Sequence, residues 1–318
     1  MRVAVTGAAG FIGSRLTEEL LALGHEVVAI DAYEPYYDRA AKEANLRAAA
    51  AHPSCTLVEL DLRDGQIEPV LEGVEVVVNE AARPGLARSW SELRAYQDCN
   101  LLAVGRLLDA ARTAGVRRLV QASTSSVYGR NAIGAEDQPL RPVSPYGVTK
   151  LAAEHLVWAY CEDAELEAVI LRYFSIYGPR QRPDMAYRIF AEAMLDSRPI
   201  VVFGDGRQSR TNTYVDDCVA GTIAAMHDAV PGETYNLGGS TEVALLDAIA
   251  ILADELGVDP KIQHGPPRRG DQQRTVADCT KAADAFGYDP QVGPDVALRE
   301  LARWVRARRA DPTVAAPS

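Results

Sequence analysis

Two residues of the sequence, Tyr146 and Lys150, have the types and the spacing of a proton-transfer pair. Residues four apart on a helix lie on the same face, so the phenol and the ammonium group are expected side by side. A phenol with a pKa of about 10 is a poor base, and half-ionising it at neutral pH needs roughly 4 kcal/mol of differential stabilisation. A neighbouring cation in a poorly solvated cleft lowers the pKa of a phenol in this way. The pair predicts that Tyr146 takes a proton from a substrate hydroxyl group, although both could also be surface residues of an ordinary helix.

A glycine-rich turn near the N-terminus has the pattern of a dinucleotide site. Gly7, Gly10 and Gly13 follow a strand-like segment and open a helical one. Glycines at this spacing let backbone N–H groups approach a pyrophosphate at the positive end of the helix dipole. Phe11 and Ile12 lie within the same turn, so we expect them beside the cofactor as well.

Acidic residues at the ends of two later strands refine the choice of cofactor. Asp31 ends the second predicted strand, 18 residues after Gly13. A carboxylate there accepts hydrogen bonds from a ribose diol and repels a 2′-phosphate, which favours NAD over NADP. Asp61 and Leu62 close the third strand, where the adenine is expected. The positive ring of NAD would add to the stabilisation of a Tyr146 phenolate.

The elements that must position these residues alternate regularly along the first half of the chain. Short apolar runs, predicted to be buried strands, cover Arg2–Thr6, Glu26–Ile30, Thr56–Leu60, Val74–Asn79, Arg118–Ala122 and Ala168–Arg172. Helical patterns lie between them at Gly13–Leu23, Cys99–Ala114 and Val148–Cys161. Buried strands separated by amphipathic helices are typical of a parallel sheet covered on both faces. We therefore predict an α/β fold with a Rossmann-type doubly wound parallel sheet.

After Tyr177 the elements become shorter and are broken by Gly, Pro and Asp-Pro pairs. We expect the chain to return to the sheet through a helix at Val215–His227 and a strand at Thr234–Leu237. The prediction is a NAD-binding Rossmann domain, a smaller C-terminal α/β substrate-binding lobe and a frayed tail. Their predicted bounds are 1–176 plus about 211–240, 177–210 plus about 241–310, and 311–318.

Together these motifs resemble the extended short-chain dehydrogenase/reductase family, in its nucleotide-sugar epimerase/dehydratase branch. The glycine turn matches the family's Gly-x-x-Gly-x-x-Gly pattern, and Tyr146 and Lys150 match its active-site tyrosine and lysine. The segment Ser123–Gly129 matches its strand-end motif. The resemblance covers nearly the whole chain. It implies an NAD-dependent enzyme whose catalytic residues are Tyr146, Lys150 and Thr124, with Thr124 bonded to the reacting hydroxyl group as a proton relay.

The resemblance also implies further contacts with the cofactor. Ala81 and Ala82 face the dinucleotide in that family, and Asn100 and Tyr173 are expected beside it. Many relatives have His-x-Ala-Ala where this chain has Asn79–Ala82 in the order Asn-Glu-Ala-Ala. Because the two alanines are kept, we expect NAD binding to survive the difference.

Ser125 and Ser126 separate the reactions of this branch from one another. In its 4,6-dehydratases an Asp-Glu pair occupies these two places and supplies the acid and base for the elimination of water. In its UDP-glucuronate decarboxylases a glutamate stands where Ser126 is. Hydroxyl groups cannot replace those carboxylates as proton-transfer groups near neutral pH. The resemblance therefore favours epimerisation, and we expect both serines at the substrate.

The segment Ala168–Met185 resembles the corresponding part of UDP-glucuronate 4-epimerases. Ser175 stands where most hexose 4-epimerases have asparagine and where the glucuronate enzymes have threonine. Arg182 could hold a sugar carboxylate in a charge-assisted fork, with Ser175 beside it. Arg180 and Arg182 could equally be solvated loop charges.

Arg210, Arg268 and Asp271 match the family's contacts with a nucleoside diphosphate. Two arginines brought together by folding would bind a diphosphate that the net charge of −11 otherwise repels. Asp271 would take the ribose hydroxyls of a uridine. The resemblance thus implies a UDP-sugar as substrate.

The most specific prediction is an NAD-dependent UDP-sugar 4-epimerase that interconverts UDP-glucuronate and UDP-galacturonate through a 4-keto intermediate. A UDP-glucose or UDP-N-acetylhexosamine 4-epimerase differs only at Ser175 and Arg182. A nucleotide-sugar 4-ketoreductase would consume NADH, and a non-catalytic NAD-binding protein would turn over no nucleotide sugar. All of these alternatives stay open at this point.

The composition bears on partners and location. An excess of 44 acidic over 33 basic residues argues against nucleic acid, and no apolar stretch approaches the ~18 residues of a membrane span. The chain begins directly with a strand-like segment, so we expect no signal peptide. Five scattered cysteines without a C-x-x-C pair argue against a structural metal site or a disulfide framework. We expect a soluble cytoplasmic protein without a metal, and the resemblance adds a homodimer formed through a four-helix contact.

Overall fold

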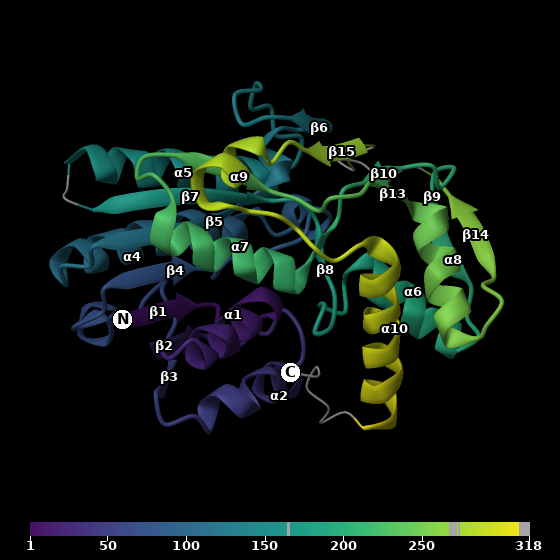
Figure 1. Ribbon diagram of the computed structural model, residues 1–318, viewed down its shortest axis with the longest axis horizontal. Coiled ribbons are helices and arrows are strands. Elements are labelled where there is room, and N and C mark those ends of the chain that lie inside the picture. The colour runs from purple at the N-terminus through teal and green to yellow at the C-terminus, as the bar shows by residue number, and fades with distance from the viewer. Residues whose placement is uncertain (164–165, 267–271, 273, 312–318) are drawn as a thin grey trace.

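The centre of the molecule is a parallel sheet of seven strands (Figure 1). The computed structural model describes residues 1–163, 166–266, 272 and 274–311. The strand order is β12-β7-β5-β4-β1-β2-β3. Their bounds are β1 (Arg2–Thr6), β2 (Glu26–Asp31), β3 (Cys55–Glu59), β4 (Val76–Asn79), β5 (Arg118–Thr124), β7 (Glu167–Tyr173) and β12 (Thr234–Leu237). The order runs outward in both directions from β1, so the predicted doubly wound α/β fold is confirmed.

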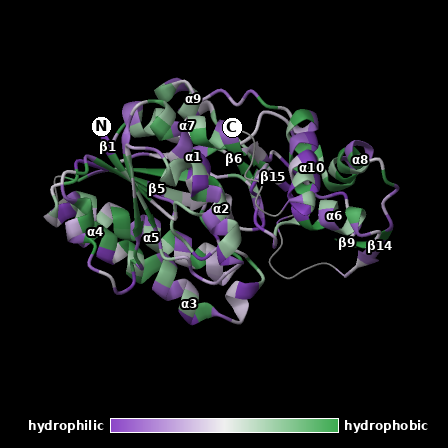
Figure 2. Cartoon of the chain, turned by 90° about the horizontal axis from the view of Figure 1, so that it is seen from below, coloured by the Kyte–Doolittle hydropathy of each residue, from purple (hydrophilic) through white to green (hydrophobic). Residues whose placement is uncertain are grey.

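Helices cover both faces of this sheet, because alternate strand residues point to opposite sides. Val3 and Val5 of β1 belong to the core below one helical layer, whereas Ala4 between them belongs to the core on the other face. The first layer contains α1 (Phe11–Ala22), α2 (Arg39–Ala50) and α7 (Val215–Asp228), and the second contains α4 (Ala103–Thr113) and α5 (Pro145–Asp163). Figure 2 shows mostly hydrophobic strands in the centre and helices with mixed hydropathy around them.

One expectation about these elements was wrong. The segment Thr56–Leu60 was expected to be a buried strand, but Thr56, Leu57 and Glu59 of β3 are exposed, and Leu57 is 42% exposed. The reason is its position at the edge of the sheet, beside β2 alone. The helical stretch expected over Cys99–Ala114 is confirmed, and it consists of a π-helical turn, η3 (Asp98–Leu102), followed by α4. Single π-helical turns occur often at functional sites.

A smaller group of elements lies beside the sheet, on the right in Figure 1. Its helices α6 (Ala186–Leu195), α8 (Leu245–Leu256) and α10 (Pro294–Ala310) pack against one another. Its strands form the parallel pair β14-β9 and the sheet β13-β10-β15-β6. Their bounds are β6 (Asn131–Gly134), β9 (Ile200–Phe203), β10 (Ser209–Arg210), β13 (Val243–Ala244), β14 (Ile262–Gly265) and β15 (Arg274–Ala277).

The remaining described elements are short connections. They are η1 (Glu68–Leu71), η2 (Arg88–Trp90), α3 (Leu93–Gln97), η4 (Ser125–Val127), β8 (Ile176–Tyr177), β11 (Thr213–Tyr214) and α9 (Thr280–Phe286). The strand and helix expected at Thr234–Leu237 and Val215–His227 are confirmed as β12 and α7. The domain bounds stay a prediction, and of the expected tail, residues 312–318 lie outside the described part.

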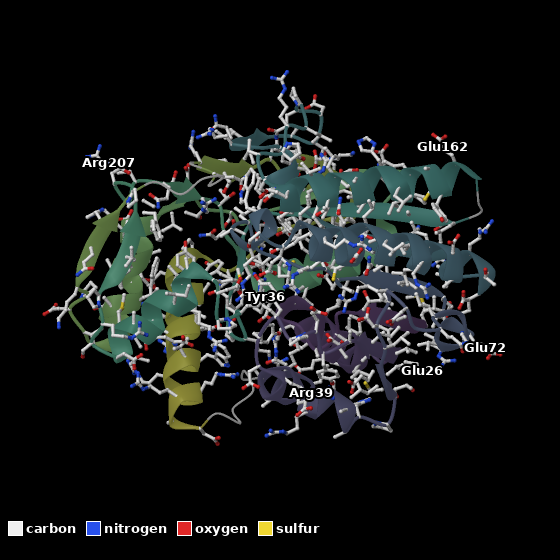
Figure 3. The ribbon with its side chains drawn as sticks, turned by 180° about the vertical axis from the view of Figure 1, so that it is seen from behind. Glu26, Tyr36, Arg39, Glu72, Glu162 and Arg207 are labelled. Carbon is white, nitrogen blue, oxygen red and sulfur yellow. The ribbon has the colours of Figure 1, made fainter. Side chains whose placement is uncertain are left out.

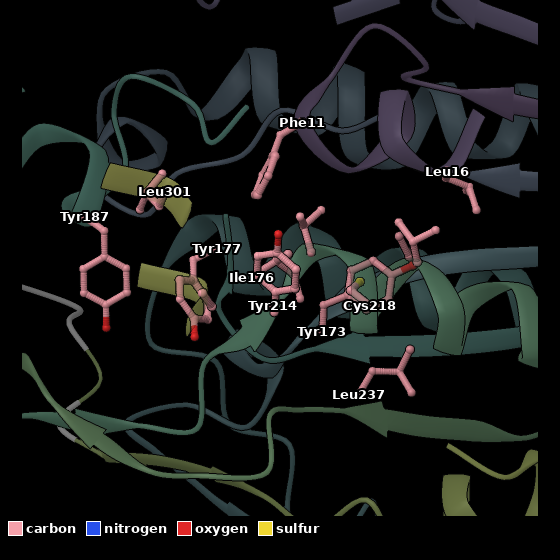
Figure 4. Close-up of a cluster of buried hydrophobic side chains, with 14 of the residues drawn as sticks. Phe11, Leu16, Tyr173, Ile176, Tyr177, Tyr187, Tyr214, Cys218, Leu237 and Leu301 are labelled. Carbon is pink, nitrogen blue, oxygen red and sulfur yellow. The ribbon is translucent and has the colours of Figure 1, made fainter. Parts of the chain in front are cut away.

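One apolar core joins the sheet to the smaller group of elements (Figure 4). Tyr177 packs edge-on against Tyr187 and Tyr214, with ring centroids 5.6 and 6.3 Å apart. The same core includes Leu237 of β12 and Leu301 of α10. Offset and edge-to-face pairs of this kind add about 0.5–1.5 kcal/mol each beyond their area. The two parts are therefore held together by packing and not only by the chain connections. Among the described helices, none is long and apolar enough to cross a membrane.

Candidate active site

The glycine turn forms a narrow cradle at the start of α1. Gly7 has a left-handed backbone (φ +65°), and a Cβ built on it would lie 2.9 Å from the backbone nitrogen of Ala81. A Cβ on Gly13 would lie 2.3 Å from the carbonyl oxygen of Gly7. Neither position accepts a side chain without moving backbone. Gly10 precedes the helix without a side-chain cap, so the N–H groups of the first turn face the cavity beside them.

A cavity of about 240 Å³ extends from this cradle along the carboxyl ends of the parallel strands. It lies where the strand order reverses, which is where doubly wound sheets bind their ligands. Most of the residues predicted at the cofactor line it, together with Arg182. They are Gly7, Gly10, Phe11, Ile12, Gly13, Asp31, Asp61, Leu62, Ala81, Ala82, Tyr146, Lys150 and Tyr173.

Tyr146 and Lys150 enter this cavity from the first turns of α5. The helix begins after Ser144, whose side chain accepts a hydrogen bond from the N–H of Gly147 at 3.1 Å. Lys150 is buried, and its Nζ donates to the carbonyl oxygen of Ala122 at 2.6 Å. Burial lowers the pKa of Lys150 to about 8, against the opposing charges of Glu80 and Glu154.

The electrostatic surroundings of Tyr146 differ from the expectation. Burial raises the pKa of Tyr146 and Glu80 adds to the rise, whereas a hydrogen bond with Thr124 and the charge of Arg182 lower it. The protein cation that favours the phenolate is therefore Arg182, and the ammonium group of Lys150 is directed to a carbonyl oxygen instead. The protein groups together leave Tyr146 protonated at neutral pH. Lowering its pKa requires additional positive charge in the cavity.

Thr124 is the last residue of β5, and Ser125 and Ser126 follow it directly in the short helix η4. Its Oγ1 accepts a hydrogen bond from the N–H of Ser126 at 3.2 Å, which caps the short helix η4. Ser125 and Ser126 are both buried in this helix. The structure thus places the hydroxyl of Thr124 beside Tyr146, with the two serines directly after it.

A buried ion pair behind the site fixes α5 to the sheet, and the sequence analysis missed it. Glu154 lies one turn after Lys150 and accepts hydrogen bonds from Arg172 of β7 at 2.7 and 3.1 Å. The hydroxyl of Ser123 donates to the same carboxylate. Arg172 also donates to the hydroxyl of Tyr128 at 2.8 Å. The spacing of Tyr146, Lys150 and Glu154 on one helix face was the available signal.

Asn100 lies in the π-helical turn and joins the loop after β4 to α5. Its side chain accepts the N–H of Arg83 at 2.7 Å, and donates to the carbonyl oxygen of Arg83 and to Thr149, both at 3.1 Å. It is not among the residues that line the cavity. Direct contact between Asn100 and the cofactor stays a prediction, and the structure shows Asn100 positioning the cavity wall.

Asp31 is buried at the end of β2, where the ribose was expected. Its two carboxylate oxygens accept the N–H groups of Ala9 at 2.9 Å and Tyr33 at 2.7 Å. Lys42, which sequence reasoning missed, lies 3.5 Å from the same carboxylate. A carboxylate has about four acceptor positions, so Asp31 can still accept ribose hydroxyls.

A chain of alternating charges lies next to Asp31 along the cavity and joins three loops. We call it the ion-pair chain; its members are Asp61, Arg63, Glu34, Arg83 and Glu92, in that order. Glu34 is central, 2.6 Å from Arg63 and 2.8 Å from Arg83. Arg63 holds the pKa of Asp61 below its usual range. Sequence reasoning found Asp61 alone. Its partner Arg63 lies only two residues later, but Glu34, Arg83 and Glu92 come from other loops.

At the substrate end, Arg182 shares the cavity with Tyr146 but is already paired. It contacts Asp184, whose carboxylate also accepts the hydroxyl of Tyr36 at 3.0 Å. Tyr36 lies near the middle of the molecule, between its two parts (Figure 3). Arg180, by contrast, is not a solvated loop charge. It is buried and donates to Ser14 at 3.1 Å and Glu18 at 2.8 Å on α1.

Four other predicted substrate residues are not among those that line the cavity: Ser125, Ser126, Ser175 and Arg210. Ser175 has a left-handed backbone with φ +44°, which is uncommon for a residue with a side chain. Arg210 lies in β10, and its Nη2 donates to the carbonyl oxygen of Gln272 at 2.9 Å. Arg268 and Asp271 lie outside the described residues. Within the described ranges, His, Cys, Asp and Glu side chains form no group of three that could hold a metal ion.

Comparisons with known proteins agree with this geometry. The model of the NAD dependent epimerase/dehydratase family matches residues 3–238. "Uncharacterized UDP-glucose epimerase YtcB" of Bacillus subtilis is 40% identical over 294 residues, covering 91% of this chain and 93% of its own. "UDP-glucuronate 4-epimerase" of Thermodesulfobacterium geofontis is 34% identical and covers 94% of each chain.

A solved structure is similar over nearly the whole chain. It is the crystal structure of UDP-glucuronic acid 4-epimerase from Bacillus cereus in complex with UDP-glucuronic acid and NAD. The TM-score is 0.94 at 36% sequence identity, and the alignment covers 96% of this chain and 99% of that one.

Proposed function

The chain belongs to the NAD dependent epimerase/dehydratase family, and from that premise we propose that it is a UDP-sugar 4-epimerase. Its proposed reaction interconverts UDP-glucuronate and UDP-galacturonate through a 4-keto intermediate. The observation that carries this proposal is the presence of Arg182 in one cavity with Tyr146. A cation at that place can bind the carboxylate of a uronate, and serines at positions 125 and 126 provide no acid and base for elimination.

The residues of the cradle fit an NAD molecule. The close backbone approach at Gly7 and Gly13 and the uncapped N-terminus of α1 suit a pyrophosphate, and Asp31 suits a ribose diol. Bound NAD accepts a hydride from the sugar and returns it. The remaining predicted cofactor residues are proposed to enclose it, and the cavity lining supports this for all of them except Asn100.

Tyr146 is the proposed base. It takes the proton of the C4 hydroxyl group, through or beside Thr124, as the hydride leaves that carbon. When the hydride returns to the other face of the 4-keto sugar, Tyr146 gives the proton back. Lys150 holds the wall of the cavity through the carbonyl oxygen of Ala122, and the charge of Arg182 lowers the pKa that burial raises at Tyr146. No cofactor is consumed in the cycle.

The residues proposed to contact the substrate begin directly after β5 and continue into the smaller group of elements. Ser125 and Ser126 would face the sugar, Ser175 and Arg182 its carboxylate, and Arg210 the diphosphate. Arg268 and Asp271 are retained in the proposal for the nucleotide, although no described contact bears on them.

Incubation of the protein with separate UDP-sugars, followed by proton NMR of the products, tests this function. We expect UDP-glucuronate to give UDP-galacturonate without net change in NADH absorbance. Net NADH consumption would indicate a 4-ketoreductase. Cofactor binding with no turnover of any nucleotide sugar would indicate a non-catalytic protein.

A second candidate is a UDP-glucose 4-epimerase. The specific observation in its favour is that Arg182 already pairs with Asp184. A neutral sugar has no carboxylate and would leave this ion pair intact. The name of the 40% identical relative points the same way. Faster conversion of UDP-glucose than of UDP-glucuronate in the same NMR assay would establish this alternative.

We also propose a homodimer and a cytoplasmic location. The supporting features are exposed apolar side chains at Leu102, just before α4, and at Val148 on α5, and five cysteines that are all free. Light scattering of the purified protein tests the dimer, and Leu102→Glu should shift it towards the monomer.

A further inference from the structure

Glu80 is a carboxyl group in the cavity that the proposed reaction does not use. It follows β4, whose last residue, Asn79, is held by Thr6 and Gln121 at 2.5 and 2.8 Å. Its side chain shares the cavity with Tyr146, Lys150 and Tyr173. Its Oε1 lies 2.7 Å from the hydroxyl of Tyr173. A buried carboxyl group so close to the base of a reaction affects the charge of that base.

A count of protons in the contacts of Glu80 indicates its protonation state. Three close contacts follow one another: Glu80 to Tyr173 at 2.7 Å, Tyr173 to Thr222 at 2.8 Å, and Thr222 to the carbonyl oxygen of Cys218 at 2.8 Å. A carbonyl oxygen only accepts, so Thr222 must donate to it. Tyr173 must then donate to Thr222. The contact between Glu80 and Tyr173 consequently needs a proton from Glu80, which an ionised carboxylate does not have.

The groups that face Glu80 come from three elements. Lys150 and Tyr146 lie on α5, Tyr173 on β7 and Cys218 on α7. Burial raises the pKa of Glu80 to about 7, and the charge of Lys150 opposes the rise. A hydrogen bond donated by Tyr173 would oppose it as well, but the proton count assigns the proton of Tyr173 to Thr222. The neutral form that the proton count requires is therefore stable at and below neutral pH.

We infer that Glu80 is a positioning residue that acts as a neutral carboxylic acid. It donates to Tyr173, and because it is neutral it places no negative charge beside the phenolate of Tyr146. This inference rests on the proposed function where it concerns the reaction. When Glu80 loses its proton, the contact with Tyr173 loses its hydrogen and the new charge opposes the phenolate of Tyr146. Turnover therefore falls on the alkaline side through the ionisation of Glu80.

Two variants and one control separate these effects. Glu80→Gln cannot ionise, but its amide group can still donate to Tyr173. Glu80→Leu can do neither. Glu162→Gln removes an exposed carboxylate at the far end of α5 (Figure 3) and serves as the matched control. Each variant is compared with the natural protein from mildly acidic to mildly alkaline pH.

The first measurement is the urea midpoint of unfolding as a function of pH. The folded protein holds the proton of Glu80 up to about pH 7, whereas an unfolded glutamate releases it near pH 4.3. The natural protein should lose stability as pH rises through this interval. Glu80→Gln should lack that loss, and Glu162→Gln should follow the natural protein. Equal pH dependence in the natural protein and Glu80→Gln would overturn the inference.

The second measurement is kcat for UDP-glucuronate over the same pH range. We expect the natural protein to lose most of its turnover on the alkaline side, and Glu80→Gln to keep it. Glu80→Leu should be slow at every pH, because Tyr173 loses its partner. An unchanged alkaline decline in Glu80→Gln, or a Glu80→Leu variant as fast as Glu80→Gln, would refute the role in the reaction. If no UDP-sugar turns over, the proposed function fails, while the unfolding measurement still decides the protonation of Glu80.

Discussion

The guanidinium group of Arg182 donates from Nε to Oδ1 of Asp184 at 3.0 Å and from Nη2 to Oδ2 at 3.3 Å. The same cation lowers the pKa of Tyr146. Arg182 is therefore held by one carboxylate while it acts on the proposed base, and a substrate carboxylate would bind beside the one it already has. Substrate preference then depends on how these two negative charges share one cation.

Replacing Arg182 with glutamine should distinguish uronate from neutral sugars. We expect kcat/KM to fall at least about tenfold more for UDP-glucuronate than for UDP-glucose, a difference of ~1.4 kcal/mol. The reason is that Asp184 then repels the uronate without a cation between them. Steady-state kinetics on both substrates measure the ratio, and equal losses would reject a carboxylate site. Arg198→Gln, an exposed arginine paired in the same way with Asp196, is the matched control.

Removal of the Tyr146 hydroxyl should abolish proton transfer while NAD remains bound. For Tyr146→Phe we expect kcat to fall by about 10²–10⁴-fold, the usual contribution of a positioned acid–base group. Equilibrium binding of NAD, followed by fluorescence of the protein, should change little because the cradle at Gly7 and Gly13 is untouched. A variant with full turnover would disprove the assignment of the base.

The ion-pair chain should slow the release of NAD. Glu34→Gln removes the central carboxylate between Arg63 and Arg83, and partly exposed pairs contribute about 0.2–1 kcal/mol each. We expect the dissociation rate of NAD to rise a few-fold, about fivefold for 1 kcal/mol. High salt should accelerate release from the natural protein and have a smaller effect on the variant. Stopped-flow displacement with excess cofactor measures the dissociation rate of NAD from the natural protein and from the variant. Identical rates would show that the ion-pair chain contributes to fold stability alone.

Breaking the buried pair of Glu154 and Arg172 should destabilise the fold severely. Glu154→Gln leaves the guanidinium group of Arg172 buried with a neutral partner, and such losses typically cost about 3–5 kcal/mol. The pKa of Lys150 should fall as well, because the charge of Glu154 opposes its lowering. Urea unfolding against the exposed control Glu162→Gln provides the measurement. A loss no larger than that of the control would show that the pair is not needed for stability.

The left-handed backbone at Ser175 predicts a gain in stability from asparagine. Residues with a Cβ pay about 1–2 kcal/mol in this conformation, and asparagine tolerates it better than serine. Ser175→Asn should therefore raise the melting temperature, whereas β-branched Ser175→Thr should lower it. Thermal unfolding of both variants gives the order of their melting temperatures. The reverse order would show that the backbone at Ser175 is not strained. The asparagine is also expected to reduce the preference for UDP-glucuronate.

Much of the fold was predictable because its signals are local. The run that became β1 lies inside the sheet, so its central residues Val3–Val5 are apolar and fully buried, and the glycine turn lies directly between a strand and a helix. The exposure of β3 was not predictable, because a position at the edge depends on which strands pair. The π-helical turn at Asn100 depends likewise on contacts with Arg83 and Thr149.

The candidate site divides in the same way. Tyr146 and Lys150 lie on one helix and were found from their spacing, whereas Arg182, the cation that acts on Tyr146, approaches from another loop. The sequence analysis gave Glu80 no role, because the difference from relatives lies at Asn79, and the contact of Glu80 with Tyr173 spans 93 residues of sequence. Charges paired across distant loops leave no periodic signal, so folding alone reveals them.

The aromatic cluster around Tyr177 limits how this protein can be recombined with its relatives. Since Leu237 and Leu301 share one interior with it, a chimaera that joins this sheet to a foreign sugar-binding half would place mismatched rings at the seam. Engineers who want a new specificity should graft individual loops at the cavity mouth and leave the interlocked tyrosines unaltered.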